Sequence, residues 1–208
     1  MKQFKFVLVM IISIALVMLM ASCKKSDSGS DTTGPNNPNT GSYGSGSLSF
    51  NTNSSTAGNS WNISGSFNPT GTGQTGSGVM SWYDASSNVA WVYAFLWRSS
   101  NDWDYAILEL ERTPSSNKVG TGTYSFASGT DNTATLIFIK GASSQTSTNG
   151  NYYMLESGTA NITSYSSTGM KGNFSGAGMG ISGSASGTPV QVSAGSFDVT
   201  FGTAYGTP

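Results

Sequence analysis

The chain has 208 residues, of which only 9% are charged, and its formal net charge is −1. Typical soluble proteins carry about 25% charged residues, and nucleic-acid-binding domains show a clustered basic face, which this composition does not provide. The chain has no histidine and one cysteine, which excludes Ser-His-Asp and Cys-His catalysis, imidazole metal ligands and an internal disulfide. We therefore predict no cofactor, no metal and no nucleic-acid partner.

The first 22 residues have the zones of a secretory signal peptide. Lys2 and Lys5 form a short basic region, and the run from Phe6 to Met20 is apolar except for Ser13. This run is shorter than the about 20 residues that a transmembrane helix needs. Without residues 1–22, seven Lys and Arg face ten Asp and Glu, which gives a formal charge of −3.

The segment Met20-Ala21-Ser22-Cys23 resembles the lipobox of bacterial lipoproteins. The resemblance implies that Cys23 becomes the mature N-terminus and carries several acyl chains, palmitate among them. One chain binds a membrane only marginally, so several are needed for a stable anchor. An aspartate directly after the lipidated cysteine would resemble an inner-membrane retention signal. Lys24 stands at that position instead, which favours the bacterial outer membrane, on its periplasmic or surface side. The alternatives are an ordinary signal peptide with a coincidental cysteine and a transmembrane anchor.

Residues 23–45 are the lipidated cysteine and a predicted linker. Residues 24–45 contain no Leu, Ile, Val, Met, Phe or Trp. Such a segment cannot bury enough apolar surface to offset its ordering entropy. We expect a flexible tether with a root-mean-square reach of about 25 Å.

From residue 46 on, apolar residues recur at every second position, which is typical of β-strands. We expect one domain over residues 46–208: an all-β, single antiparallel β-sandwich or flattened β-barrel. The Gly-rich stretches 71–78 and 176–187 lack the context of a nucleotide-binding loop, and we expect flexible loops there. The expected strands cover 48–50, 61–67, 79–83, 89–98, 103–111, 122–126, 134–140, 152–155, 158–165, 170–175 and 190–201.

The two strands on either side of Ser100 and Asn101 are apolar on both faces. A turn centred between these residues pairs position i with position 201 − i. One face then carries Trp91, Tyr93, Phe95 and Trp97 opposite Leu110, Leu108, Ala106 and Asp104. A strand that is apolar on both faces is covered on both, or one face lines a cavity or groove.

Candidate binding residues gather near this turn. Aromatic side chains can stack on sugar rings or anchor a protein partner, although most large aromatics belong to a core. Among the five tryptophans, Trp61, Trp82, Trp91, Trp97 and Trp103, we expect Trp91 in the core and leave both roles open for the two nearest the turn. The predicted ligand-binding residues are Trp97, Trp103, Arg98 and Asp104.

Acidic residues offer a weaker candidate site. Glu109 and Glu111 lie two residues apart, so a strand places both on one face about 6–7 Å apart, a separation that suits glycoside hydrolysis. We favour solvated strand-end acids, paired with Arg98 or Arg112, and predict no catalytic residue. Three acids in loop contexts could bind Ca²⁺ but lack EF-hand spacing, so we interpret them as turn acids: Asp102, Asp104 and Asp131.

The last third of the chain resembles a family of uncharacterised Gram-negative lipoproteins. The resemblance is best over residues 158–201, in Gly158-Thr-Ala-Asn-Ile-Thr-Ser-Tyr165, Met170-Lys-Gly-Asn-Phe-Ser-Gly176 and Pro189-Val-Gln-Val-Ser-Ala-Gly-Ser-Phe-Asp-Val-Thr-Phe201. It implies a lipidated N-terminus before one β-rich domain and transfers no catalytic residues. Physically, Gly172 and Gly195 suit bulges or close backbone approaches, and we expect Phe174, Phe197, Val199 and Phe201 in the core.

These observations predict a membrane-anchored extracytoplasmic lipoprotein whose non-catalytic β-domain binds a glycan or a protein partner. Two alternatives remain open. The first is a calycin-like carrier of a small apolar ligand, which requires an internal cavity of ligand size. The second is a carboxylate-based glycosidase that uses Glu109 and Glu111.

Overall fold

A computed structural model describes residues 43–67, 76–99, 101–113, 118–143 and 149–203. The predicted signal peptide, Cys23, nearly all of the linker and the first part of the Gly-rich stretch 71–78 lie outside these ranges. All ten strands belong to one compact unit, formed by Pro38–Asn68 and Thr75–Pro208.

The described chain is all-β, as predicted. The strands are β1 (Ser45–Thr52), β2 (Ser60–Gly65), β3 (Gly76–Asp84), β4 (Val89–Ser99), β5 (Asp102–Arg112), β6 (Gly122–Ser125), β7 (Asn132–Ala142), β8 (Asn151–Ser166), β9 (Gly169–Ser182) and β10 (Pro189–Thr200). A short 3₁₀ turn, η1 (Gly183–Ala185), separates β9 from β10. The strands form one sheet in the order β2-β1-β10-β9-β8-β6-β7-β5-β4-β3. Its pairings are antiparallel except for β6 with β7.

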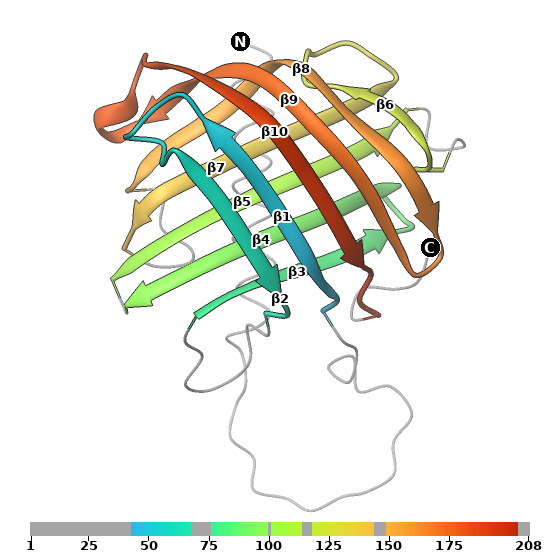
Figure 1. Cartoon of the computed structure of the whole chain (residues 1–208). Coiled ribbons are helices and arrows are strands. Elements are labelled where there is room, and N and C mark those ends of the chain that lie inside the picture. Colours follow the sequence, from blue (N-terminus) through green and yellow to red (C-terminus); the bar gives the residue numbers. More distant parts are fainter. Residues whose placement is uncertain (1–42, 68–75, 100, 114–117, 144–148, 204–208) are drawn as a thin grey trace, which may run out of the picture. The chain divides into compact units, whose positions relative to one another are not determined.

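The sheet curls until its two ends meet (Figure 1). The end strand β3 contacts β1 and β2, and Ser66 forms an isolated parallel bridge with Val79. The backbone N–H of Ser81 donates to the carbonyl of Tyr43 (2.8 Å), and Gly202 N–H donates to the carbonyl of Ser81 (2.7 Å). The two ends of the sheet are joined by these few hydrogen bonds and not by a continuous ladder. The sheet therefore forms a flattened barrel with two layers.

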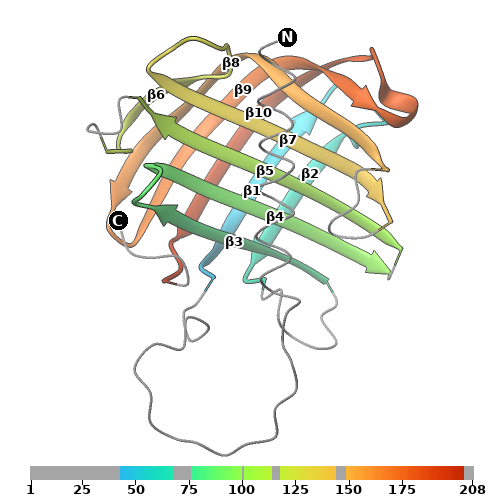
Figure 2. The same ribbon diagram turned by 180° about the vertical axis from the view of Figure 1, so that it is seen from behind.

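One layer contains β1, β2, β8, β9 and β10, and the other contains β3, β4, β5 and β7 (Figures 1 and 2). Aromatic rings fill the space between the layers. The Phe50 ring lies 5.2 Å from Phe138 and 5.9 Å from Phe174, and Phe138 stacks on Tyr153 at 5.0 Å. Rings at these separations leave no room for a ligand between them.

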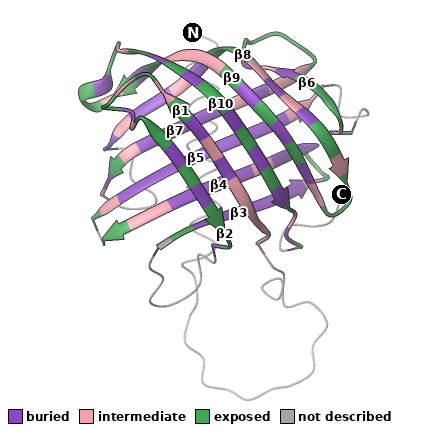
Figure 3. Cartoon of the chain, viewed as in Figure 1, coloured by how far each residue is buried: buried purple, intermediate pink, exposed green. Residues whose placement is uncertain are grey.

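The outer side of the first layer is polar. Buried and exposed residues alternate along β10 and the first half of β9 (Figure 3), as expected for strands with one face on the core. Lys171 and Asp198 form an exposed ion pair there at 2.9 Å. Phe174, Phe197 and Val199 are buried, as predicted, and Phe201 is partly buried against the same core.

Glycines allow close contact between strands. A Cβ on Gly172 would lie 2.4 Å from the Phe197 ring, and one on Gly195 would lie 2.4 Å from the Phe174 ring, which confirms the expected close approaches. The prediction of a loop over 176–187 is wrong for its first half, because β9 continues to Ser182. The loop predicted over 71–78 is likewise wrong for 76–78, where β3 begins. A Cβ on Gly178 would lie 1.9 Å from the carbonyl oxygen of Met154 in β8. The glycines of this stretch therefore permit strand pairing.

The predicted register of the β4–β5 hairpin is also wrong. Ser99 lies opposite Asp102, as the predicted turn requires, but Trp97 lies opposite Trp103 and Trp91 opposite Glu109. A bulge at Arg98 shifts the register by one residue. In every pair beyond it, from Trp97 with Trp103 onwards, the two residue numbers add up to 200 and not to the predicted 201. The aromatic residues of β4 therefore share a face with Trp103, Tyr105 and Ile107, and the core face carries Ala90, Val92 and Ala94 with Leu110, Leu108 and Ala106.

Candidate functional site: an aromatic sheet face

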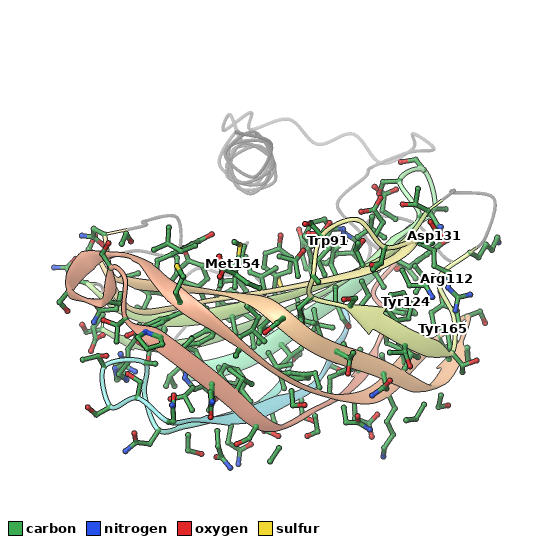
Figure 4. The ribbon with its side chains drawn as sticks, turned by 90° about the horizontal axis from the view of Figure 1, so that it is seen from above. Trp91, Arg112, Tyr124, Asp131, Met154 and Tyr165 are labelled. Atoms are coloured by element: carbon green, nitrogen blue, oxygen red, sulfur yellow. The ribbon has the colours of Figure 1, made fainter. Side chains whose placement is uncertain are left out.

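The second layer is apolar on its outer side as well as its inner side. We call the outer side of β3, β4, β5, β7 and the start of β8 the aromatic face. In Figure 4, Trp91 and Met154 lie on this side of the sheet, away from β1 and β10. The face consists of Met80, Trp82, Trp91, Tyr93, Phe95, Trp97, Trp103, Tyr105, Ile107, Ile137, Ile139, Tyr152 and Met154.

Strand register arranges these side chains in rows across the sheet. The central row is Met80, Tyr93, Ile107, Ile137 and Met154. Towards the β4–β5 turn, the next row is Phe95, Tyr105, Ile139 and Tyr152, followed by Trp97 and Trp103. On the other side of the central row come Trp82, Trp91 and Glu109, and then Glu111. The carboxylates therefore lie at one end of an otherwise uncharged face.

The aromatic rings of this face stack on one another. Tyr93 stacks on Trp82 at 4.9 Å and on Phe95 at 6.2 Å. Phe95 in turn stacks on Phe67 at 4.6 Å, from the segment after β2. A ring whose faces already contact other rings cannot offer them to a sugar, and Tyr93 and Phe95 are only 4% and 1% exposed.

Of the five tryptophans, Trp61 belongs to the core between the layers. The expectation that Trp91 is a core residue is wrong. Because of the bulge at Arg98, Trp91 pairs with Glu109 and not with Leu110, so its side chain lies on the aromatic face. Trp97 and Trp103 stack on each other at 5.2 Å, with ring planes 12° apart, at the turn end of the aromatic face. The Trp97 indole N–H donates to the carbonyl of Ser99.

The other two predicted ligand-binding residues satisfy each other. Arg98 donates to both carboxylate oxygens of Asp104, at 2.6 and 2.7 Å, and to Asp102. Asp104 is 3% exposed and also accepts from the Gly141 amide at 2.8 Å and from Lys140 at 3.3 Å. Burial alone would raise the pKa of Asp104, but the bonds from Arg98 and Gly141 outweigh it and lower the pKa. Arg98 and Asp104 therefore brace the hairpin end, on the core side of β5.

Glu109 differs from the expected solvated acid. It is 8% exposed, and burial, with a smaller contribution from Glu111, raises its pKa to about 8. Burial also raises the pKa of Glu111. Neither predicted arginine partner is engaged with them: Arg98 binds Asp102 and Asp104, and Arg112 donates to the carbonyls of Lys118 and Thr121. At neutral pH Glu109 is therefore mostly protonated, which suits its position between Trp91 and Thr135.

A polar groove of about 450 Å³ lies on the other layer, where β1, β8 and β10 have register shifts. Eight of its lining residues carry a hydroxyl or amide group or are glycine, namely Thr52, Asn53, Ser157, Gly158, Ser175, Gly176, Gln191 and Ser193, and the other two are Ala177 and Val192. Its volume is within the usual range of small-molecule sites.

Within the described ranges, no three His, Cys, Asp or Glu side chains gather in a way that could hold a metal ion. The same part of the chain has no helix with the length and apolarity to cross a bilayer.

Sequence reasoning missed most of the aromatic face, including Met80, Tyr105, Ile137, Ile139 and Tyr152. One signal could have found part of it. The run Ala134-Thr-Leu-Ile-Phe-Ile139 is apolar at both parities, as is the middle of the β4–β5 hairpin, and adjacent strands of that kind predict a layer that is apolar on both sides.

Comparison of the chain with protein-family models, with curated proteins and with solved structures found no match.

Proposed function

We propose that this protein is a lipid-anchored lipoprotein of the bacterial outer membrane whose β-domain is non-catalytic and binds a partner protein through the aromatic face. The signal-peptide zones and the lipobox-like segment ending in Cys23 support the anchor. The observation that carries the binding role is the contrast between the layers: one has a polar outer side, and the other has an aromatic one. Large apolar faces are typical of interaction sites. Ten of the thirteen side chains of this face are at most 9% exposed in the 208-residue chain, so a partner protein would have to take the place of the groups that bury them.

The packing of the rings favours a protein over a glycan at this face. Sugar recognition by aromatics uses open ring faces, whereas Tyr93 and Phe95 each stack on other rings. Protein interfaces combine an apolar, aromatic centre with charges near the rim, which matches the uncharged central rows and the terminal Glu111.

A glycan remains the second candidate because of the polar groove, whose serine, threonine, asparagine and glutamine side chains could bind hydroxyl groups. The carrier alternative finds no support in the ring contacts between the layers. The glycosidase alternative finds little in the apolar surroundings of Glu109, where the neighbouring groups are Trp91 and Thr135.

The anchor and the binding role need separate tests. Palmitate labelling of the wild type but not of Cys23→Ala supports the anchor, and equal labelling of both would refute it. For binding, proteins near the anchored chain are cross-linked in intact cells and compared between Met154→Lys, on the aromatic face, and the matched control Asn173→Lys, an exposed position on the polar side of β9. We expect the cross-linked species to disappear only in Met154→Lys. Retention in both variants would refute the role of this face.

A further inference from the structure

We propose that the polar groove over β1, β10, β9 and β8 binds a neutral polysaccharide whose chain lies across the strands. The proposal rests on the second candidate function named above, a glycan ligand, and gives it a site and a ligand class. It depends neither on the aromatic face nor on the lipid anchor. The groove lies on the polar outer side of its layer, where Ser175, Gln191 and Ser193 are exposed and accessible to a ligand.

Bulges in neighbouring strands shape the groove. Ser193 and Ala194 of β10 lie opposite the single residue Ser175 of β9. Glu156 is an extra residue of β8 beside β9, and the register of β1 against β10 shifts at a nearby level. A bulge bends its strand and takes the extra residue out of the regular ladder. Because four adjacent strands, β1, β10, β9 and β8, contribute to the lining (Figure 1), the hollow extends across the strands.

The bulge of β10 is held in a strained conformation. Ala194 has a φ of 51°, in the left-handed region that alanine rarely adopts. The preference of the residue itself therefore does not explain the bulge. Strained residues persist where the surrounding structure fixes them, and they are concentrated at functional sites. The strain at Ala194 therefore supports a binding role for the groove beside it.

A row of hydroxyl and amide side chains crosses the sheet through the groove. The row consists of Ser60, Asn51, Ser193, Ser175, Thr159 and Ser125, from β2, β1, β10, β9, β8 and β6 in turn. With strands about 4.8 Å apart, the row is roughly 24 Å long. A polymer that lies across the strands therefore meets polar groups beyond both ends of the groove.

The next row along the strands is a natural comparison, because its side chains bond to one another. The hydroxyls of Ser49 and Ser196 are 2.8 Å apart. Asn161 donates to the Asn173 side chain at 3.2 Å and accepts from the Thr123 hydroxyl at 2.7 Å. Hydrogen-bonding groups that already have partners on the surface offer less to a ligand.

The groove, in contrast, holds polar groups that have no partner in the described part of the chain. No group there bonds to the side-chain amide of Gln191 or to the hydroxyls of Ser175 and Ser193. Asn53 is fixed at the β1 end, since its Oδ1 accepts from the backbone N–H of Gln191 at 2.8 Å. Exposed groups of this kind bind water in the free protein, and the hydroxyl groups of a ligand can replace that water.

The lining also selects a neutral ligand. None of the ten described lining residues is charged or aromatic. A charged ligand would lose hydration without gaining an ion pair, and the exposed Glu156 beside Ser157 would repel an anionic glycan. Sugar hydroxyls donate and accept, as do the serine and amide side chains. Because each hydrogen bond in water contributes little and no ring is present for stacking, binding requires many contacts, which a polysaccharide chain provides and a single sugar does not.

Affinity electrophoresis of the full chain, purified in mild detergent, tests the site. The gels contain dextran, mannan or β-1,3-glucan as neutral polysaccharides, or polygalacturonate as an anionic one. We expect at least one neutral polysaccharide to retard the wild type, and polygalacturonate not to retard it. Gln191→Ala should weaken binding about three- to tenfold, as expected for the loss of one hydrogen bond. Ser175→Lys, whose long side chain would occupy the groove, should weaken it at least as much. The matched control Asn173→Lys adds the same charge to β9 outside the groove and should bind like the wild type.

The other outcomes overturn the proposal. If no neutral polysaccharide retards the wild type, the groove is not a site for this ligand class. Equal binding by Ser175→Lys and Asn173→Lys would place any binding elsewhere, and retardation by polygalacturonate alone would exclude a neutral ligand. Thermal unfolding of each variant checks the fold, and if Ser175→Lys does not fold, Gln191→Ala decides. None of these results bears on the aromatic face, which the cross-linking of Met154→Lys tests separately.

Discussion

Phe138 of β7 is the residue through which the two layers can be tested most directly. It is 0% exposed, and its ring lies 5.2 Å from Phe50, 5.7 Å from Trp61 and 5.0 Å from Tyr153. Phe138→Ala removes a ring that touches both layers, and its neighbours are other rings that cannot easily collapse into the space. We expect the free energy of unfolding to fall by about 3–5 kcal/mol, the usual cost for a buried phenylalanine.

Urea unfolding followed by tryptophan fluorescence measures this loss. The midpoint should fall while the slope m stays constant, because the surface exposed on unfolding hardly changes. A loss of that size corresponds to a decrease in Tm of roughly 8–15 °C for a domain of this length. Met179→Ala, at a side chain that is 43% exposed, is the control and should cost less than about 1 kcal/mol. Equal losses in the two variants would refute the packing of the layers through this ring.

Three further predictions follow from single contacts. Because the folded state holds the proton of Glu109 up to a pKa of about 8, against an ordinary value of 4.5, stability should fall as pH rises between these values. Urea unfolding at pH 5 and pH 8.5 should show a smaller fall for Glu109→Gln, and identical pH dependence would contradict the burial. Gly178→Ala should destabilise by about 2–3 kcal/mol because its Cβ would meet the Met154 carbonyl. Gly120→Ala, whose nearest contact would be 3.8 Å, should stay within about 0.5 kcal/mol, and similar midpoints would disprove the close approach of β8 and β9. Asp104→Asn should cost about 2–3 kcal/mol by weakening charged hydrogen bonds, and an unchanged thermal midpoint would show that the cluster does not brace the hairpin.

The Arg98 cluster and the aromatic face meet at the end of the β4–β5 hairpin, but they have different roles. Asp104 points to the core side with Arg98 and Lys140 around it, while its neighbour Trp103 points to the aromatic face. Sequence proximity grouped all four predicted ligand-binding residues together. Strand alternation separates them into a structural ion cluster and a pair of stacked indoles at the edge of the proposed interface.

The sequence alone determined the strand content and the core of the C-terminal strands. Alternation with period two is a local property, so Phe197 and Val199 could be assigned to one face without knowledge of their neighbours. The glycines at 172 and 195 could be recognised in the same way, because a glycine within an alternating pattern indicates a close approach or a bulge. Lipidation of Cys23 stays a prediction, since this residue lies outside the described ranges.

Only the tertiary structure decided how the strands meet. One extra residue at Arg98 reversed the face that Trp91, Tyr93 and Phe95 share with β5, because a shift of one position moves every side chain to the opposite face. The burial of Glu109 and the pairing of β9 beyond Gly176 likewise depend on strands that are distant in the sequence. Periodicity fixes the two faces of each strand, but the neighbours that cover them are set by register and by long-range packing.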